Sequence, residues 1–286
     1  MSKFSMNFLM ALAMFSWGVA WTNAKIVNEY LSFNNLIFFR FFIGFISIYP
    51  FIIKSNIKKY FRFKNLKFII PCSILFYIYN LFFFMGTHYS YAGKGAVLVT
   101  SLNPILTFII MTVIVKKINL KEIFGISVGL LGGLIIMDVF NEGFSTIFDI
   151  NNIFFVLCAI TWGINTVITN FGQKDTPPFH FIFLCYFFTT IISFPFTEFQ
   201  LINLKELNLK FYFNFMIVSL GAMSFGTSMY LYATPKLGPI KASAYIFSVP
   251  FIALVTANIF LDEPIASNVI IGGLISLSAV YLINKK

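Results

Sequence analysis

Residues 95–115 read GAVLVTSLNPILTFIIMTVIV, and residues 240–261 read IKASAYIFSVPFIALVTANIFL. Both runs are almost wholly apolar, and each has one proline near its middle, Pro104 in the first and Pro250 in the second. An α-helix needs about 20 mainly apolar residues to cross the hydrocarbon core of a bilayer, and both runs reach that length. They therefore predict two membrane-spanning helices of related design.

Eight more apolar runs of comparable length lie around these two, and the polar gaps between them are too short for a soluble domain. The first run is followed by many others and lacks a small-residue cleavage site, so we interpret it as a retained helix and not as a signal peptide. We expect an all-α, polytopic membrane protein of ten transmembrane helices, near residues 4–24, 35–53, 68–87, 95–115, 122–140, 152–171, 179–197, 211–232, 240–261 and 267–283.

The composition also indicates a protein surrounded by lipid. Hydrophobic residues make up 59% of the 286 residues and charged residues only 10%, whereas a soluble domain is about one quarter charged. The net charge of +10 does not indicate a nucleic-acid partner, because the basic residues lie in short gaps between apolar runs and form no basic stripe on a soluble surface. We therefore expect membrane lipid, and not nucleic acid, as a partner.

Several kinds of chemistry lack their sequence signals. The three cysteines, Cys72, Cys158 and Cys185, lie in apolar runs without a CxxC pair or metal-ligand spacing. The sequence has no HExxH motif, no Ser/His/Asp set and no phosphate-binding glycine loop. We therefore expect no metal, no cofactor, no enzymatic activity and no ATP-driven pumping.

The distribution of charge predicts the orientation. Loops rich in lysine and arginine stay in the cytoplasm. With ten spans and a cytoplasmic N-terminus, most of the 20 basic residues fall on the inner side and most of the 10 acidic residues on the outer side. We therefore expect both termini in the cytoplasm and the chain in the cytoplasmic membrane. The inner basic residues include Lys54, Lys58, Lys59, Arg62, Lys64, Lys67, Lys116, Lys117 and Lys121.

An ordered series of residues recurs half a chain later. Single matches of this kind are weak evidence, but an ordered series at nearly constant spacing indicates an internal repeat. The pairs, at offsets of 145 to 147 residues, are Ser16-Trp17-Gly18 with Thr161-Trp162-Gly163, Pro50 with Pro195, Ala96 with Ala242, Pro104 with Pro250, and Gly125 with Gly272.

The repeat predicts two halves, residues 1–146 and 147–286, with five spans in each. Because five is odd, the second half enters the membrane from the opposite side. Inverted five-helix repeats of this kind are typical of secondary transporters, in which the solute binds near the midplane between the halves. Each half can adopt the conformation of the other, which exposes one site to each side in turn.

The second half has a characteristic order of features from Leu220 to Leu282. Tyr230 lies in one helix, the loop Lys236-Leu237-Gly238-Pro239 follows, and the next helix has a central Pro250 with Glu263 at its end. This order resembles the EamA-type transporters of the drug/metabolite transporter superfamily, and the first half resembles it more loosely. Lys116 occupies the position equivalent to Glu263, so the acid is not duplicated. The resemblance implies transport of an amino acid, a metabolite, a nucleotide-linked compound or a drug, without indicating which.

Polar and large amphipathic side chains within the spans are the candidates for solute binding. A polar group in hydrocarbon is costly unless it is paired or hydrated, so such residues are functional candidates by default. Some of them have an equally plausible role in joining or packing helices. The candidate substrate-binding residues are Trp17, Asn23, Arg40, Asn80, Trp162, Asn165, Tyr230, Ser243 and Tyr245.

Arg40 leaves two interpretations open. It either contacts an anionic solute group or an acid such as Glu29, or it extends to the outer interface as a snorkelling side chain. Pro104 and Pro250 free backbone carbonyls and kink their helices, and we expect them to act as hinges. Gly125, Gly129 and Gly133 have the small-xxx-small spacing of a helix-packing seam, which could also form a homodimer face.

The sequence thus predicts a secondary transporter that moves a small organic metabolite across the membrane by alternating access. The resemblance alone suggests export. A passive channel or facilitator is the main alternative, since no carboxylate lies in mid-span to relay protons. A lipid-modifying membrane enzyme is a weaker alternative, because no titratable cluster lies at one interface.

Overall fold

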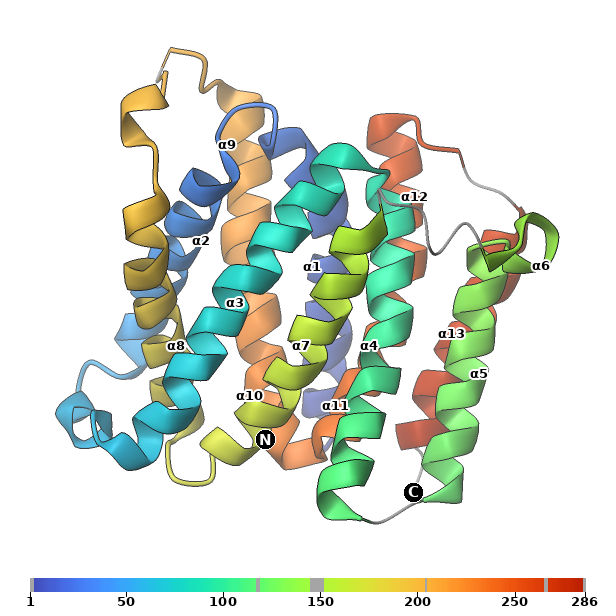
Figure 1. Cartoon of the computed structure of the whole chain (residues 1–286), viewed down its shortest axis with the longest axis horizontal. Coiled ribbons are helices and arrows are strands. Elements are labelled where there is room, and N and C mark those ends of the chain that lie inside the picture. The colour runs from blue at the N-terminus through green and yellow to red at the C-terminus, as the bar shows by residue number, and fades with distance from the viewer. Residues whose placement is uncertain (1–2, 117–118, 145–151, 204, 265–266, 285–286) are drawn as a thin grey trace.

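The computed structural model describes residues 3–116, 119–144, 152–203, 205–264 and 267–284, and this part of the chain consists of helices joined by loops, without a strand (Figure 1). The first half contains α1 (Lys3–Val27), α2 (Phe33–Ile48), α3 (Phe63–Tyr89), α4 (Ala92–Val115), α5 (Leu120–Ile136) and the single turn α6 (Val139–Glu142). The second half contains α7 (Ile153–Gly172), α8 (Pro178–Ser193), α9 (Leu209–Met216), α10 (Ser228–Leu237), α11 (Pro239–Ala244), α12 (Val249–Leu261) and α13 (Ser267–Asn284).

Eight helical segments are long and apolar enough to cross a bilayer. Their lipid-facing residues include many large apolar side chains that water would not tolerate as a continuous surface, such as Phe4, Phe63 and Leu209. The chain is therefore a multi-pass helical membrane protein. The eight segments are Phe4–Val27, Phe33–Phe51, Phe63–Tyr89, Ala92–Val115, Ile153–Gly172, Pro178–Phe196, Leu209–Leu237 and Pro239–Leu261.

Two shorter helices pack side by side at one edge of the bundle. α5 has 17 residues and α13 has 18, of which Ile270–Asn284 form the apolar part. About 17 residues is the lower limit for a helix that spans a bilayer. Their backbones approach closely where a β-carbon added to Gly132 would lie 2.7 Å from the carbonyl oxygen of Gly272.

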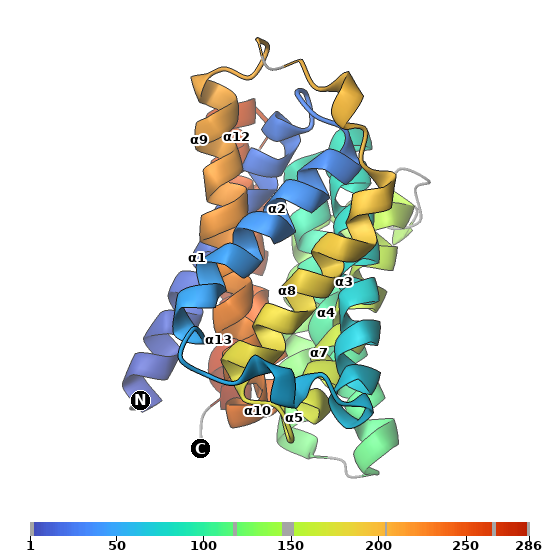
Figure 2. The ribbon, with the colours of Figure 1, turned by 90° about the vertical axis from the view of Figure 1, so that its left-hand side faces the viewer.

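The helices α1 and α7 begin at opposite ends of the bundle. In Figure 1, α1 begins at the end of the bundle that also holds the C-terminal end of α13, whereas α7 begins at the other end. Figure 2 shows the two chain ends at the same side of the molecule. Successive long helices alternate in direction, so the chain crosses the bundle repeatedly with short connections.

Several contacts between helices recur between their counterparts in the other half. α1 packs on the segment Ile217–Thr227 and on α12, and its counterpart α7 packs on α3 and α4. α2 contacts Ile217–Thr227, and its counterpart α8 contacts α3. The remaining large contacts pair counterparts with each other: α2 with α8, α4 with α12, and α5 with α13. Contacts made by a helix of the first half thus recur between the counterpart helices of the second half.

Two helices of the second half depart from regular α geometry. Ile217–Thr227 is π-helical within the continuous segment Leu209–Leu237. Pro250 is the second residue of α12, after a 3₁₀ turn at Tyr245–Ser248, whereas α4 continues as an α-helix through Pro104. The two matched prolines thus have different local structures, and their role as hinges stays a prediction.

Two glycine substitutions should have opposite effects on stability, because Gly132 lies at the close contact of α5 with α13 and Gly221 lies in open space on another helix. Gly132→Ala places a methyl group against the Gly272 backbone and should lower stability by about 1–3 kcal/mol. Gly221→Ala meets nothing closer than 4.0 Å and should be neutral or stabilising, because alanine favours a helix by up to about 1 kcal/mol. Thermal unfolding of the purified protein in detergent measures both, and an equal loss in both variants would contradict the seam.

Candidate functional site

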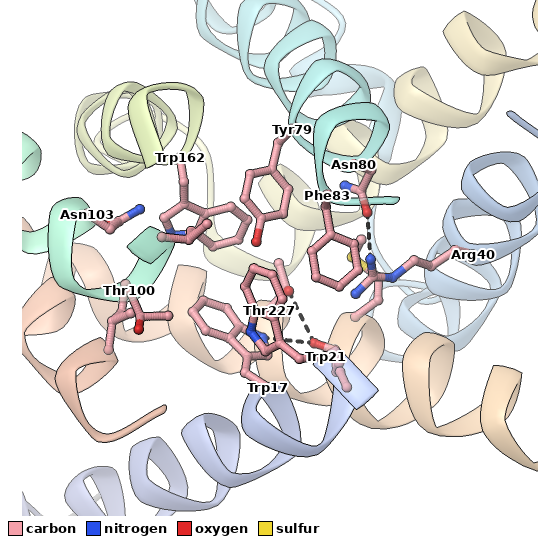
Figure 3. Close-up of a pocket in the computed structure, with 15 residues that line it drawn as sticks. Trp17, Trp21, Arg40, Tyr79, Asn80, Phe83, Thr100, Asn103, Trp162 and Thr227 are labelled. Carbon is pink, nitrogen blue, oxygen red and sulfur yellow. Dashed lines mark hydrogen bonds between the residues drawn. The ribbon is translucent and has the colours of Figure 1, made fainter. Parts of the chain in front are cut away.

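A small cavity lies in the centre of the bundle, between the two halves (Figure 3). The volume of this cavity is about 40 Å³, which is enough for a few water molecules. α1, α2, α3 and α4 contribute lining residues from the first half, and α7, the π-helical segment and the 3₁₀ turn contribute from the second. A midplane cavity between two halves is where many transporters bind solute.

Aromatic rings form the walls of this cavity. The rings of Trp17 and Trp162, at matched positions of the two halves, meet edge to face with centroids 5.0 Å apart. Tyr79 lies 4.7 Å from Trp162, and Trp21 lies 4.8 Å from Phe83. The indole nitrogen Nε1 of Trp17 donates to the carbonyl of Ala222 at 3.1 Å, which fixes the ring. All 3 tryptophans of the chain line the cavity.

Arg40 is the charged group of the cavity. It is 5% exposed; its Nε donates to the carbonyl of Val218 at 3.2 Å and its Nη1 to Oδ1 of Asn80 at 2.6 Å. Nδ2 of Asn80 in turn donates to the carbonyl of Phe76, which holds the Asn80 oxygen toward Arg40. The guanidinium also lies 5.4 Å from the Phe83 ring centroid. Arg40 is therefore buried at the cavity and does not snorkel to an interface.

No carboxylate of the described residues neutralises Arg40. The ion pairs in that part of the chain join Lys25 to Glu263 and Lys64 to Asp175. A guanidinium has five N–H donors in a planar fork that fits a carboxylate, and two of the Arg40 nitrogens are used as above. An unpaired cation in a buried site is unfavourable, and the remaining N–H donors of Arg40 are left without a carboxylate partner among the described residues.

The π-helical segment supplies backbone acceptors for the site. Its carbonyls at Val218, Ala222 and Met223 accept hydrogen bonds from Arg40, Trp17 and Tyr186, respectively. Short π-helical stretches are frequent at functional sites. The sequence predicts this span but not its helix type, because the glycine, serine and methionine residues there are equally compatible with an ordinary α-helix.

Four of the candidate residues line the cavity: Trp17, Arg40, Asn80 and Trp162. Tyr230 is fully buried behind the two tryptophans, at 5.2 Å from Trp17 and 5.7 Å from Trp162, and its hydroxyl pairs with Thr166 at 3.0 Å.

The other four candidates have internal hydrogen bonds away from the lining. Oδ1 of Asn165 accepts from Cys72, and Nδ2 of Asn23 donates to the carbonyl of Val19. Oγ of Ser243 donates to the carbonyl of Ile240. The hydroxyl of Tyr245 donates to Asn7. The bonds of Asn165 and Tyr245 join different helices, whereas those of Asn23 and Ser243 stay within their own helix.

Several lining residues were not among the sequence candidates. They are Trp21, Phe83, Thr100, Asn103 and Thr227. Trp21 follows Trp17 by four residues, which places both rings on one face of a helix, so helical spacing could have indicated it. Thr100 and Asn103 are three residues apart, again on one face, and precede the matched Pro104.

A carboxylate closes the end of the bundle away from the termini. Glu263 is 7% exposed, and its two oxygens accept the backbone N–H groups of Ala92 and Gly93 at the start of α4, each at 3.0 Å. Nζ of Lys25, at the end of α1, lies 3.3 Å from the same carboxylate. A carboxylate at a helix N-terminus satisfies free N–H groups and complements the helix dipole. This group, Glu263 with Lys25 and the start of α4, joins the two halves and is called the Glu263 clamp.

The opposite end of the bundle is built differently. The counterpart of the α4 start is the start of α11, where Pro239 has no N–H to donate. The residue that matches Glu263 is Lys116, which has a left-handed backbone and is basic. Clamp geometry of the Glu263 type is therefore confined to one end of the described molecule.

Known proteins resemble the chain over its whole length. The model of the EamA-like transporter family matches residues 4–138 and again residues 150–285. An uncharacterized transporter of Archaeoglobus fulgidus is 24% identical over 282 residues, which cover 97% of this chain and 98% of the relative. The uncharacterized transporter YoaV of Bacillus subtilis is 24% identical over 273 residues, which cover 93% of this chain and 92% of the relative.

A solved crystal structure has the same fold, with a TM-score of 0.74 at 12% identity over 98% of this chain and 96% of the other. The apolar helices and the matches to transporters define the class: a multi-pass membrane transporter rather than an enzyme. Within that class, the chain belongs to the EamA-like transporter family. This confirms the resemblance stated from the sequence.

The Glu263 clamp predicts a graded loss of stability. Glu263→Ala removes two charge-assisted hydrogen bonds and an ion pair, and should lower the free energy of unfolding by about 2–3 kcal/mol. Lys25→Met leaves both backbone bonds of Glu263 in place and removes a partly exposed partner, so about 1 kcal/mol or less is expected. Thermal unfolding in detergent ranks the two; a larger loss from Lys25→Met would contradict the clamp.

Proposed function

We propose that this protein is a secondary transporter that carries a small organic anion, above all a carboxylate, through the central cavity by alternating access. The observation that supports this most is Arg40, a buried cation that faces an aromatic cavity with no acidic partner among the described residues. Amino acids and related metabolites carry the matching group.

The proposal includes ten spans in two inverted five-helix repeats, residues 1–146 and 147–286. α5 and α13 would complete the eight longer spans. Two observations support this arrangement: contacts between helices recur between their counterparts in the other half, and α1 and α7 run in opposite directions. Because both halves line one cavity, a rocking motion of one against the other changes which end is open.

The two ends of the bundle support a gated carrier rather than a pore. The cavity holds only a few waters, and the Glu263 clamp ties the halves together at one end. A channel would need a continuous polar stripe along several helices. Saturable counterflow in proteoliposomes would support a carrier, whereas single-channel currents would support a channel.

The source of energy divides two versions of the proposal. No aspartate or glutamate of the described residues lines the cavity, so facilitated diffusion stands beside proton-coupled transport. Transport with and without an imposed proton gradient separates them. Export, as the family resemblance suggests, and a homodimer are further parts of the proposal.

Arg40 gives the direct test of solute charge. In proteoliposomes, Arg40→Met should lower kcat/KM for a labelled carboxylate by about 100-fold, because a buried charged partner is lost. Arg40→Lys keeps the charge without the planar fork and should be intermediate. Arg62→Met is the matched control, since Arg62 is the other arginine of the chain and lies at the exposed N-cap of α3. Unchanged carboxylate kinetics in Arg40→Met would overturn the proposal.

The proposed orientation can be read by labelling in intact cells. Lys58 and Lys205 are both exposed, in loops that the proposal places on opposite sides. The native thiols at Cys72, Cys158 and Cys185 are buried and should give little background. Lys58→Cys should react with a membrane-impermeant maleimide only after permeabilisation, and Lys205→Cys should react without it. Reaction of both from one side would contradict the topology.

A further inference from the structure

Asn103 is a buried polar residue at the cavity whose side chain has no partner. It is 1% exposed and lines the cavity, and its amide makes no hydrogen bond within the described part of the chain. Pro104 removes the N–H that would otherwise bond the carbonyl of residue 100, yet the Asn103 amide does not bond that carbonyl either. Leaving a buried amide unpaired costs about 1–3 kcal/mol, so packing does not explain this residue.

Asn103 and Arg40 lie on different sides of the aromatic walls. In Figure 3, Arg40 and Asn80 lie on one side of the view, Thr100 and Asn103 lie on the other, and the rings of Trp17, Tyr79 and Trp162 stand between them. Thr100 donates to the carbonyl of Ala96, which leaves the lone pairs of its oxygen free to accept. The cavity therefore has a charged pole on α2 and α3, an aromatic middle, and a neutral polar pole on α4.

We infer that Asn103 is the second polar contact of the solute and selects carboxylates that carry a hydroxyl or amide group at their far end. The inference rests on the proposed function, because it places the carboxylate at Arg40. An amide can donate and accept at once, which matches a hydroxyl or an amide. A solute that lacks this group leaves the Asn103 amide unpaired in the closed site. Because an unpaired buried amide is unfavourable, such a solute binds more weakly.

The internal repeat indicates which residue can replace Asn103, because the matched position of the other half holds a different side chain. The residue matched to Asn103 is Val249, which also precedes a proline and is fully buried, but does not line the cavity. Asn103→Val therefore installs a side chain found at the same place in the other half. Asn103→Leu, which is larger than asparagine but is branched at the same γ position, is a second variant that keeps the test open if valine packs poorly.

The chain has a matched control one turn further along the same helix. Thr107 is fully buried on α4 and its hydroxyl oxygen is unpaired, but it does not line the cavity. Thr107→Val also removes an unpaired buried polar atom and should leave solute selection unchanged. Since all 3 tryptophans line the cavity, quenching of intrinsic tryptophan fluorescence reports its occupancy without a label.

The experiment compares two pairs of ultraviolet-transparent probes in the full-length protein. The pairs are cyclohexylacetate with 4-hydroxycyclohexylacetate and butanoate with 4-hydroxybutanoate, each differing by one hydroxyl. In at least one pair the hydroxylated probe should have about a tenfold lower Kd. Asn103→Val and Asn103→Leu should abolish that preference by weakening the hydroxylated probe alone, while Thr107→Val retains it.

The outcomes separate this inference from the proposed function. If both members of each pair bind equally, and binding is lost in Arg40→Met, the inference on Asn103 is wrong and the proposed function stands. A preference that survives both Asn103 substitutions, or an equal loss of both probes in them, also overturns the inference. If no probe quenches fluorescence in the native protein, the proposed carboxylate function fails and the inference fails with it.

Discussion

The absence of hydrogen-bonding partners in lipid governs this structure. Backbone groups within the bilayer must bond inside the chain, which is why the described segments are helices. Side chains obey the same rule, and most buried serines, threonines and asparagines bond a carbonyl in their own helix or its neighbour, as Asn80, Ser73 and Thr189 do. At the cavity, Arg40 keeps free donors and Asn103 bonds to nothing in the described chain, whereas other unpaired polar atoms, such as the Thr107 hydroxyl oxygen, lie away from it.

The matched helices of the two halves line one cavity, and differences between the halves make its two sides chemically unlike. Trp17 and Trp162 are matched and meet in the middle. Arg40 has no basic counterpart in α8, and the polar Asn103 has the apolar Val249 as its counterpart. The result is a cavity with unlike poles made from like helices. The Glu263 clamp adds a difference between the two ends, because among the described residues a carboxylate caps the start of α4, whereas the matching start of α11 has Pro239 and no such cap.

The fold could be predicted well from the sequence because each signal is local. Runs of about 20 apolar residues define spans, and the recurrence of Trp-Gly and proline pairs defines the repeat. The site could be predicted only in part. Trp17, Arg40, Asn80 and Trp162 stand out as polar or amphipathic groups in apolar runs, and they line the cavity. Asn23, Asn165, Ser243 and Tyr245 stand out equally, but their bonds are made elsewhere.

The sequence by itself determined that this is a helical membrane protein of two related halves, because hydrophobicity and repetition are properties of the chain. It could not determine which polar residues share a space, because that depends on helix rotation and on contacts between residues more than a hundred positions apart. The bond of Arg40 to Val218 is one example, and the capping of α4 by Glu263 is another. Tertiary packing alone decided which buried polar groups found partners within the protein and which of them line the cavity.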